Sequence, residues 1–199
     1  MIVDSLTFGA IAMKLASAAV QTNRIPQRVF RSEYRRFAFV EFDLFSGPSF
    51  WSLLQALAAS SLDKCITTVA VEPHPVDYFH KEFGVYGAIQ VDAVASSNDY
   101  YDALSSHPEA WPADSLLDNS FVLTWFSESV QWLIWGERTS ELAIVALRDR
   151  FEPQVRSLAE KAGIRLFSLD DALSLASLGF RNRTVPERWE TDFRRNYGG

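Results

Sequence analysis

Three apolar runs between residues 121 and 147 constrain the fold more than any other feature of the sequence. They cover residues 121–126 (FVLTWF), 131–135 (QWLIW) and 141–147 (ELAIVAL), and aromatic and β-branched side chains dominate them, as is typical of strands. The segments between the runs are too short to carry a crossover between parallel strands, so the neighbours must be antiparallel. The sequence therefore predicts a three-stranded antiparallel meander.

The remaining patterns place helices around one sheet. We expect an N-terminal helix within residues 1–20, and helices over 48–62, from Pro75 to Gly84, and over 99–106, 151–162 and 168–178. Further strands are expected at 37–45, 64–71, 88–91 and 164–167. The fold class is α+β (mixed α/β), with a single sheet that contains the meander and has flanking helices.

The meander is apolar on both of its faces. This pattern indicates that helices cover one face of the sheet and that loops or a partner cover the other. Trp132 and Trp135 are three residues apart and must project to opposite faces of their strand. We expect one of the two indoles in the core and the other partly exposed.

The length of 199 residues fits one domain. We place a single globular domain at residues 1–180. Residues 181–199 are rich in arginine and poor in apolar anchors, so we expect a basic tail that is extended or frayed. A lone cysteine, Cys65, cannot form an internal disulfide and is typical of a reducing cytosol.

The apolar N-terminal segment resembles an export or membrane signal only superficially. Asp4 lies where a signal peptide needs positive charge, and Lys14 interrupts the apolar stretch that a cleaved signal or a membrane-spanning helix requires. We therefore expect a cytoplasmic protein without a membrane partner.

Charge is distributed unevenly along the chain. The net charge of −6 combines +4 over residues 1–36, −11 over 37–136, −1 over 137–180 and +2 over 181–199. A region this acidic repels phosphate backbones and attracts basic proteins, so we expect no direct binding of nucleic acid. The same acidity can also serve solubility alone, and charge by itself leaves both roles open.

No phosphate-binding, dinucleotide-binding, zinc-protease or nucleophile-elbow motif is present in the sequence. The one local group with catalytic or metal-binding potential is Glu72, His74, Asp77 and His80, directly after a predicted strand. However, His74 and His80 lack the spacing that places ligands on one helical face, and Pro73 and Pro75 shape a turn there. Cys65 with His80 as its base is a weaker pair, because the thiol lies in an apolar strand pattern.

An acidic and aromatic segment is the better candidate for binding. Tyrosine and tryptophan supply large contact areas at low entropic cost, and neighbouring carboxylates add charge selectivity. The alternative is that one tyrosine packs inward and the aspartates only stabilise the start of a helix. The candidate partner-binding residues are Asp99, Tyr100, Tyr101, Asp102, Trp111 and Asp114.

Within residues 131–145, a Trp-bearing strand leads into Gly, Glu and Arg and then into a strand that opens with Glu. The positions that carry this pattern are Trp132, Trp135, Gly136, Glu137, Arg138, Glu141, Leu142 and Ile144. The pattern resembles bacterial immunity proteins, which neutralise the toxin domains of polymorphic or contact-dependent inhibition systems. The resemblance covers about 25 of the 199 residues, and a Gly-acidic-Arg hairpin is also good turn chemistry.

The resemblance implies a cytoplasmic, non-enzymatic protein without cofactor or metal, whose partner is a cognate and basic toxin. Many toxin domains are basic nucleases, so charge-steered occlusion of the toxin's active site is the expected mechanism. Two alternatives stay open: a small metal-dependent hydrolase using the Glu72 to His80 region, and a regulatory domain whose basic C-terminal tail binds an acidic partner.

Overall fold

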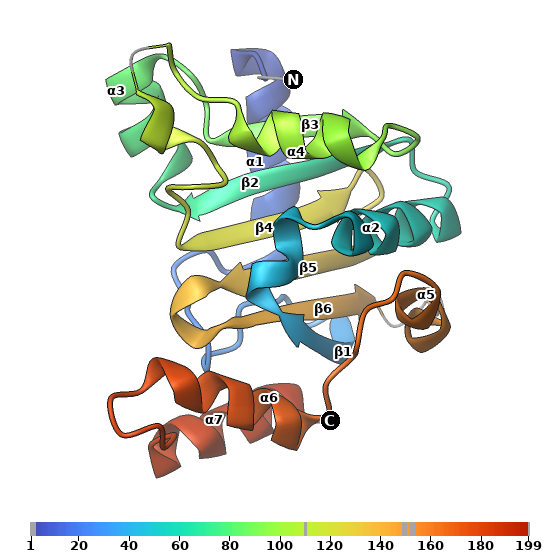
Figure 1. The fold of residues 1–199 in the computed structure, drawn as a ribbon, viewed down its shortest axis with the longest axis vertical. Coiled ribbons are helices and arrows are strands. Elements are labelled where there is room, and N and C mark those ends of the chain that lie inside the picture. The colour runs from blue at the N-terminus through green and yellow to red at the C-terminus, as the bar shows by residue number, and fades with distance from the viewer. Residues whose placement is uncertain (1–2, 110, 149–150, 152–153, 199) are drawn as a thin grey trace.

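The computed structural model describes residues 3–109, 111–148, 151 and 154–198. Its centre is a six-stranded sheet of order β1-β6-β5-β4-β2-β3, in which every neighbouring pair is antiparallel (Figure 1). The predicted α+β class and the meander, β4-β5-β6, are confirmed, and β1, β2 and β3 enlarge the sheet. The strands are β1 Tyr34–Glu41, β2 Cys65–Glu72, β3 Ala88–Asp92, β4 Val122–Ser127, β5 Trp132–Glu137 and β6 Leu142–Arg148.

Helices cover the sheet on both faces. Apolar side chains of α2, α4 and α5 pack on one face, and those of α1, α6 and α7 pack on the other. Figure 1 shows α2 and α4 in front of the strands, α1 behind them, and α6 and α7 at the edge formed by β1. The helices are α1 Ser5–Ala18, α2 Pro48–Ser60, α3 Lys81–Phe83, α4 Ser97–Ser105, α5 Val155–Lys161, α6 Leu169–Ala176 and α7 Glu187–Tyr197.

The presence of helices on both faces of the sheet corrects two expectations for the meander. Its second face is closed by helices of the same chain, so neither loops nor a partner are needed to cover it. Trp132 and Trp135 do project to opposite faces, but both indoles are fully buried, each among the helices of its own side. Neither tryptophan is therefore available to a binding partner.

The C-terminal segment corrects a third expectation. Residues predicted as an extended or frayed tail include helix α7, whose Trp189, Phe193 and Tyr197 follow one another at four-residue steps along one helical face. Phe193 is fully buried and its ring stacks on that of Trp189, with centroids 5.0 Å apart. The Tyr197 hydroxyl donates to the Gln27 carbonyl at 2.6 Å and accepts from the Val29 N–H at 3.1 Å. These contacts bind α7 to the N-terminal connector as part of the core.

The N-terminal helix is an ordinary capped helix. Asp4 is its N-cap, and its side chain accepts a hydrogen bond from the Thr7 N–H at 2.7 Å. Phe8, Ile11 and Leu15 bury one face of α1 against the sheet. In the described part of the chain, every helix is too short or too polar to cross a membrane.

Asp63 connects the end of α2 to the turn between β4 and β5. Its Oδ2 accepts from the hydroxyls of Ser61 and Ser127 at 2.5 Å and of Ser129 at 2.6 Å, and its Oδ1 accepts from the Ser129 N–H at 2.9 Å. Burial would raise the pKa of Asp63, but these hydrogen bonds outweigh burial and lower the pKa below 3.8.

We expect Asp63→Asn to lower the free energy of unfolding by about 1–2 kcal/mol at neutral pH, because an amide replaces the oxygen that accepts three hydroxyls. Since the folded pKa is depressed, the wild-type advantage is present above pH 3.8 and is lost as the pH falls through the folded value. Urea unfolding of both proteins across this range measures it. Asp102→Asn, which removes an exposed carboxylate elsewhere, is the control; an equal loss in both variants would contradict the role of Asp63.

Candidate partner-binding surface

Acidic residues of the middle of the chain gather at one edge of the sheet. Residues 72–118, here called the acidic pole, contain nine Asp and Glu residues, one Lys and no Arg. They include α3, β3 and α4 and lie at the edge formed by β3 (Figure 1). The arginine-rich segment before β1 crosses the sheet, since Arg24 pairs with Glu72 of β2 and the Ile25 N–H donates to Glu137 of β5. Helix α7 lies at the opposite edge, next to β1, and its three Arg balance its three Asp and Glu residues. The fold thus concentrates nine of the acidic side chains of the chain at the β3 edge.

The acidic pole stays accessible to solvent. An ion pair between Arg24 and Glu72 at 2.8 Å joins it to the basic N-terminal connector. The carboxylates of Glu82, Asp102 and Asp118 are exposed. Two of the three arginines of α7 pair within the C-terminal helices instead: Arg194 with Asp170 and Glu190, and Arg195 with Asp192.

Tyr100 does not belong to this surface. It is 1% exposed, and its ring stacks on Trp51 with centroids 4.5 Å apart. Its hydroxyl donates to the Phe45 carbonyl at 3.0 Å and accepts from the Trp125 indole N–H at 2.9 Å. Burial raises the pKa of Tyr100 far above its ordinary value. The prediction of Tyr100 as a binding residue is therefore wrong: this is the tyrosine of the pair that packs inward.

The other residues predicted at the start of α4 remain at the surface. Asp99 forms a capping box with Ser96, accepting from the Ser96 N–H at 2.9 Å and from its hydroxyl at 2.6 Å. These bonds lower the pKa of Asp99. The N-cap of α4 is thus Ser96, and the helix begins two residues before the predicted start at residue 99. Tyr101 is 46% exposed and Asp102 is exposed, so both are available for contact.

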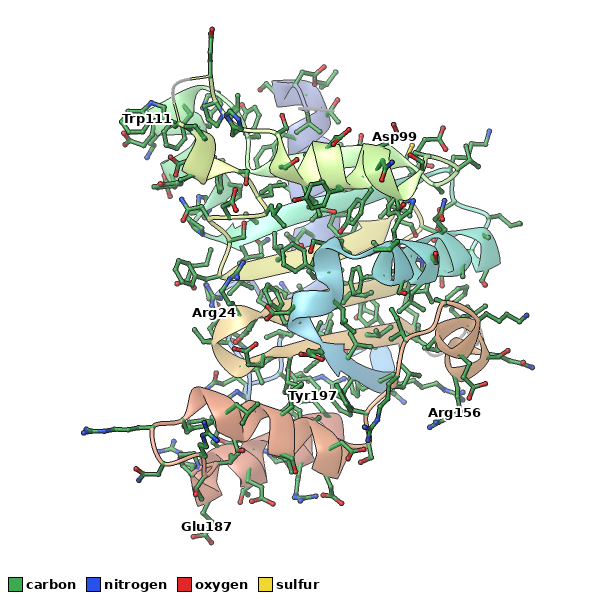
Figure 2. The ribbon with its side chains drawn as sticks, viewed as in Figure 1. Arg24, Asp99, Trp111, Arg156, Glu187 and Tyr197 are labelled. Carbon is green, nitrogen blue, oxygen red and sulfur yellow. The ribbon has the colours of Figure 1, made fainter. Side chains whose placement is uncertain are left out.

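Trp111 and Asp114 form a second, separate part of the acidic pole. Figure 2 shows Trp111 near α3 at one end of α4 and Asp99 at the other end, so the six predicted residues do not form one cluster. Trp111 is 58% exposed, and its ring lies 6.1 Å from that of Phe83. Asp114 is half-buried and accepts from the Tyr78 hydroxyl at 2.6 Å and from the Asn119 amide at 2.7 Å, both on Oδ1.

An open hollow of about 360 Å³ lies beside Trp111. Tyr78, Glu82 and Phe83 complete its wall with Trp111 and Asp114. The hydrogen bond to Asp114 raises the pKa of Tyr78, so the phenol stays protonated as the donor. Sequence reasoning missed Tyr78, Glu82 and Phe83; the density of aromatic residues between Pro75 and Gly84 was the available signal.

The Glu72 to His80 group is not assembled as a site. Glu72 binds Arg24, and His74 Nδ1 accepts from the N–H groups of Val76 at 3.3 Å and Asp77 at 3.1 Å, which uses the lone pair a metal would need. His80 stacks on Tyr86 with centroids 4.3 Å apart. Among the described residues, His, Cys, Asp and Glu form no group of three or more placed to hold a metal ion.

Cys65 does not form an activated thiol. Burial is the main cause that raises its pKa, and the nearby carboxylates of Glu128 and Asp92 raise it further. A raised pKa keeps the sulfur protonated near neutral pH, whereas a nucleophilic cysteine needs a lowered one.

The residues that carry the immunity-protein resemblance have structural roles in this fold. A Cβ at Gly136 would lie 2.7 Å from Phe42 Cδ2, so the strand needs glycine to admit that ring. Glu137 is buried and accepts from the Ile25 N–H and the Trp135 indole N–H, both at 2.8 Å. The Arg138 guanidinium donates to the carbonyls of Ser120 and Leu117.

Comparison of the chain with protein-family models, with curated proteins and with solved structures found no match in any of the three. The function must therefore be argued from the chain's own surface.

Proposed function

We propose that the protein is a non-enzymatic immunity protein that binds a cognate, basic bacterial toxin domain and occludes its active site. The observation that carries the proposal is the uncovered acidic pole, which presents exposed aromatic side chains, Tyr101 and Trp111, among its carboxylates. Such a surface combines charge selectivity with the anchors that dominate interface energies.

The physical mechanism has two stages. The field of the acidic pole accelerates encounter with a basic partner and favours approaches toward that pole. Burial of the exposed aromatic rings then slows dissociation. A toxin that cleaves nucleic acid must itself be basic around its active site, so an acidic protein competes for the same surface.

The alternatives receive less support from the geometry. The Glu72 to His80 side chains are already engaged with Arg24, backbone N–H groups and Tyr86. The hypothesis of a regulatory domain requires a C-terminal tail whose removal leaves the fold intact. However, α7 contributes Phe193 and Tyr197 to the core.

A growth assay tests the proposal. The open reading frames that neighbour this gene are induced one at a time in a laboratory bacterium, with and without this chain. The proposal expects that one of them stops growth and that co-expression restores growth through a stable complex. It is overturned if none is toxic, or if a toxic product is not neutralised.

Charge reversal tests the role of the acidic pole with that toxin. Asp102→Lys with Glu109→Lys should slow association at about 50 mM salt by roughly tenfold, and salt near 500 mM should remove most of the difference. Both side chains are exposed and neither has a hydrogen bond within the described chain. Stopped-flow mixing measures the rates.

The matched control is Glu160→Lys with Glu187→Lys, which makes the same change in net charge outside the acidic pole. Steering by the acidic pole predicts a much smaller effect for this control. If both double variants slow association equally, net charge alone determines the association rate. That result would count against a defined binding face.

A further inference from the structure

The hollow beside Trp111 has the composition of a site for a cation. Three aromatic rings line it: Tyr78 and Phe83 meet edge to face with centroids 5.5 Å apart, and Phe83 lies 6.1 Å from Trp111. The faces of such rings attract positive charge. Two carboxylates, Glu82 and Asp114, belong to the same wall. The two carboxylates disfavour an anion in the hollow.

Asp114 is held in place for such a role. Its Oδ1 accepts from the Tyr78 hydroxyl and the Asn119 amide, and that amide also donates to the Tyr78 oxygen at 2.9 Å. This triangle fixes the carboxylate, while its Oδ2 makes no hydrogen bond to any residue that the structure describes. A fixed acceptor costs less ordering on binding than a mobile one.

We propose that this hollow receives an arginine side chain from the basic partner. The guanidinium stacks on the exposed face of Trp111 and donates to Asp114 Oδ2, with Glu82 adding charge at the rim. The assignment rests on the proposed function only in that the arginine comes from a basic protein partner.

Arginine fits the hollow better than lysine. A guanidinium is planar, so it can stack on an indole and still donate in its own plane to a carboxylate. It is also more weakly hydrated than an ammonium, so its transfer from water to an aromatic wall is easier. The alkyl part of the side chain can pack on Phe83.

The test uses peptides and does not need the toxin. Protein labelled with ¹⁵N at its indole nitrogens is titrated with acetyl-Gly-Arg-Gly-amide, and with counterparts that carry citrulline or lysine. Citrulline has nearly the same shape as arginine but no charge. We expect a saturable shift of the Trp111 resonance, with the arginine peptide binding about fivefold more tightly than the citrulline peptide. Absence of saturation, or equal affinity for citrulline or lysine, overturns the assignment.

Variants separate the hollow from the general acidity of the pole. Asp114→Asn removes the charge but keeps an Oδ1 that accepts from Tyr78 and Asn119, and it should weaken the arginine peptide about fivefold. Asp92→Asn removes the same charge from an exposed carboxylate of the acidic pole outside the hollow, keeps an Oδ1 that can accept from the Val94 N–H, and should leave affinity unchanged. Equal weakening by both variants overturns the site.

Trp111→Ala, followed by peptide fluorescence polarisation, should abolish binding without lowering the melting temperature, because most of this side chain is already exposed. Binding that survives Trp111→Ala overturns the proposal. If the arginine peptide binds but the growth assay finds no toxin, the arginine site stands and only the immunity role is refuted. If a toxin is neutralised but the arginine peptide does not bind, only the arginine site is refuted.

Discussion

Tyr100→Ala is expected to lower the free energy of unfolding by about 3–5 kcal/mol, the range for truncating a fully buried aromatic side chain. The change removes the ring that stacks on Trp51 and the oxygen that accepts from the Trp125 indole. It also leaves the Phe45 carbonyl without its hydroxyl donor in the interior. Equilibrium unfolding in urea, followed by far-ultraviolet circular dichroism, measures the loss.

Two single variants bracket this result. Tyr100→Phe keeps the ring and should cost about 1–2 kcal/mol, because the Trp125 N–H loses its acceptor. Tyr101→Ala should change stability by less than about 0.5 kcal/mol, since that side chain is partly exposed. If Tyr101→Ala proved as costly as Tyr100→Ala, the orientation of α4 would be wrong.

The two tyrosines show where sequence reasoning about the surface fails. The acidic start of the helix was predictable, and so was the fact that its two tyrosines point in different directions. Leu104 follows Tyr100 by four residues and shares its buried face, which was the available signal for the inward side. The depth of the pocket that receives Tyr100 depends on Trp51 and Trp125, which are distant in sequence.

The fold could be predicted where local patterns decide it. Short connections determined the meander, and the structure confirms the predicted helix ends at Pro48, Gly84 and residue 168, where Ser168 forms a capping box. The order of the outer strands could not be predicted, because β1 pairs with β6 across more than a hundred residues. No short turn connects these two strands, so the local sequence holds no signal for their pairing.

The C-terminal helix was missed for a related reason. Charge dominates residues 187–197, and an amphipathic helix with few apolar residues resembles a solvated tail until its docking site is known. The hollow beside Trp111 was missed because two segments separated along the chain build it, Tyr78 to Phe83 and Trp111 to Asp114. Only the second of these had been predicted to bind a protein partner.

Glu137→Ala should lower the free energy of unfolding by about 2–4 kcal/mol. Two buried donors, the Ile25 N–H and the Trp135 indole N–H, lose their common acceptor, and the N-terminal connector loses its link to β5. Glu137→Gln retains an oxygen that can accept both bonds, and should stay within about 1 kcal/mol of wild type at neutral pH. Urea unfolding of the three proteins separates the hydrogen bonds from the charge.

The pH dependence of the glutamine variant gives the sharper test. Burial is the main cause that raises the pKa of Glu137 above 4.5, and the bonds from Ile25 and Trp135 only partly offset it. Because the folded protein then binds the proton more tightly than the unfolded chain, the contribution of Glu137 to stability is fully present below pH 4.5. It is lost as the pH rises through the folded value. Glu137→Gln lacks this loss, so its stability relative to wild type should increase as the pH is raised from acid to neutral. The other carboxylates titrate in both proteins and cancel in the difference. A difference that does not change with pH would show that Glu137 is solvated, and would contradict its burial behind the N-terminal connector.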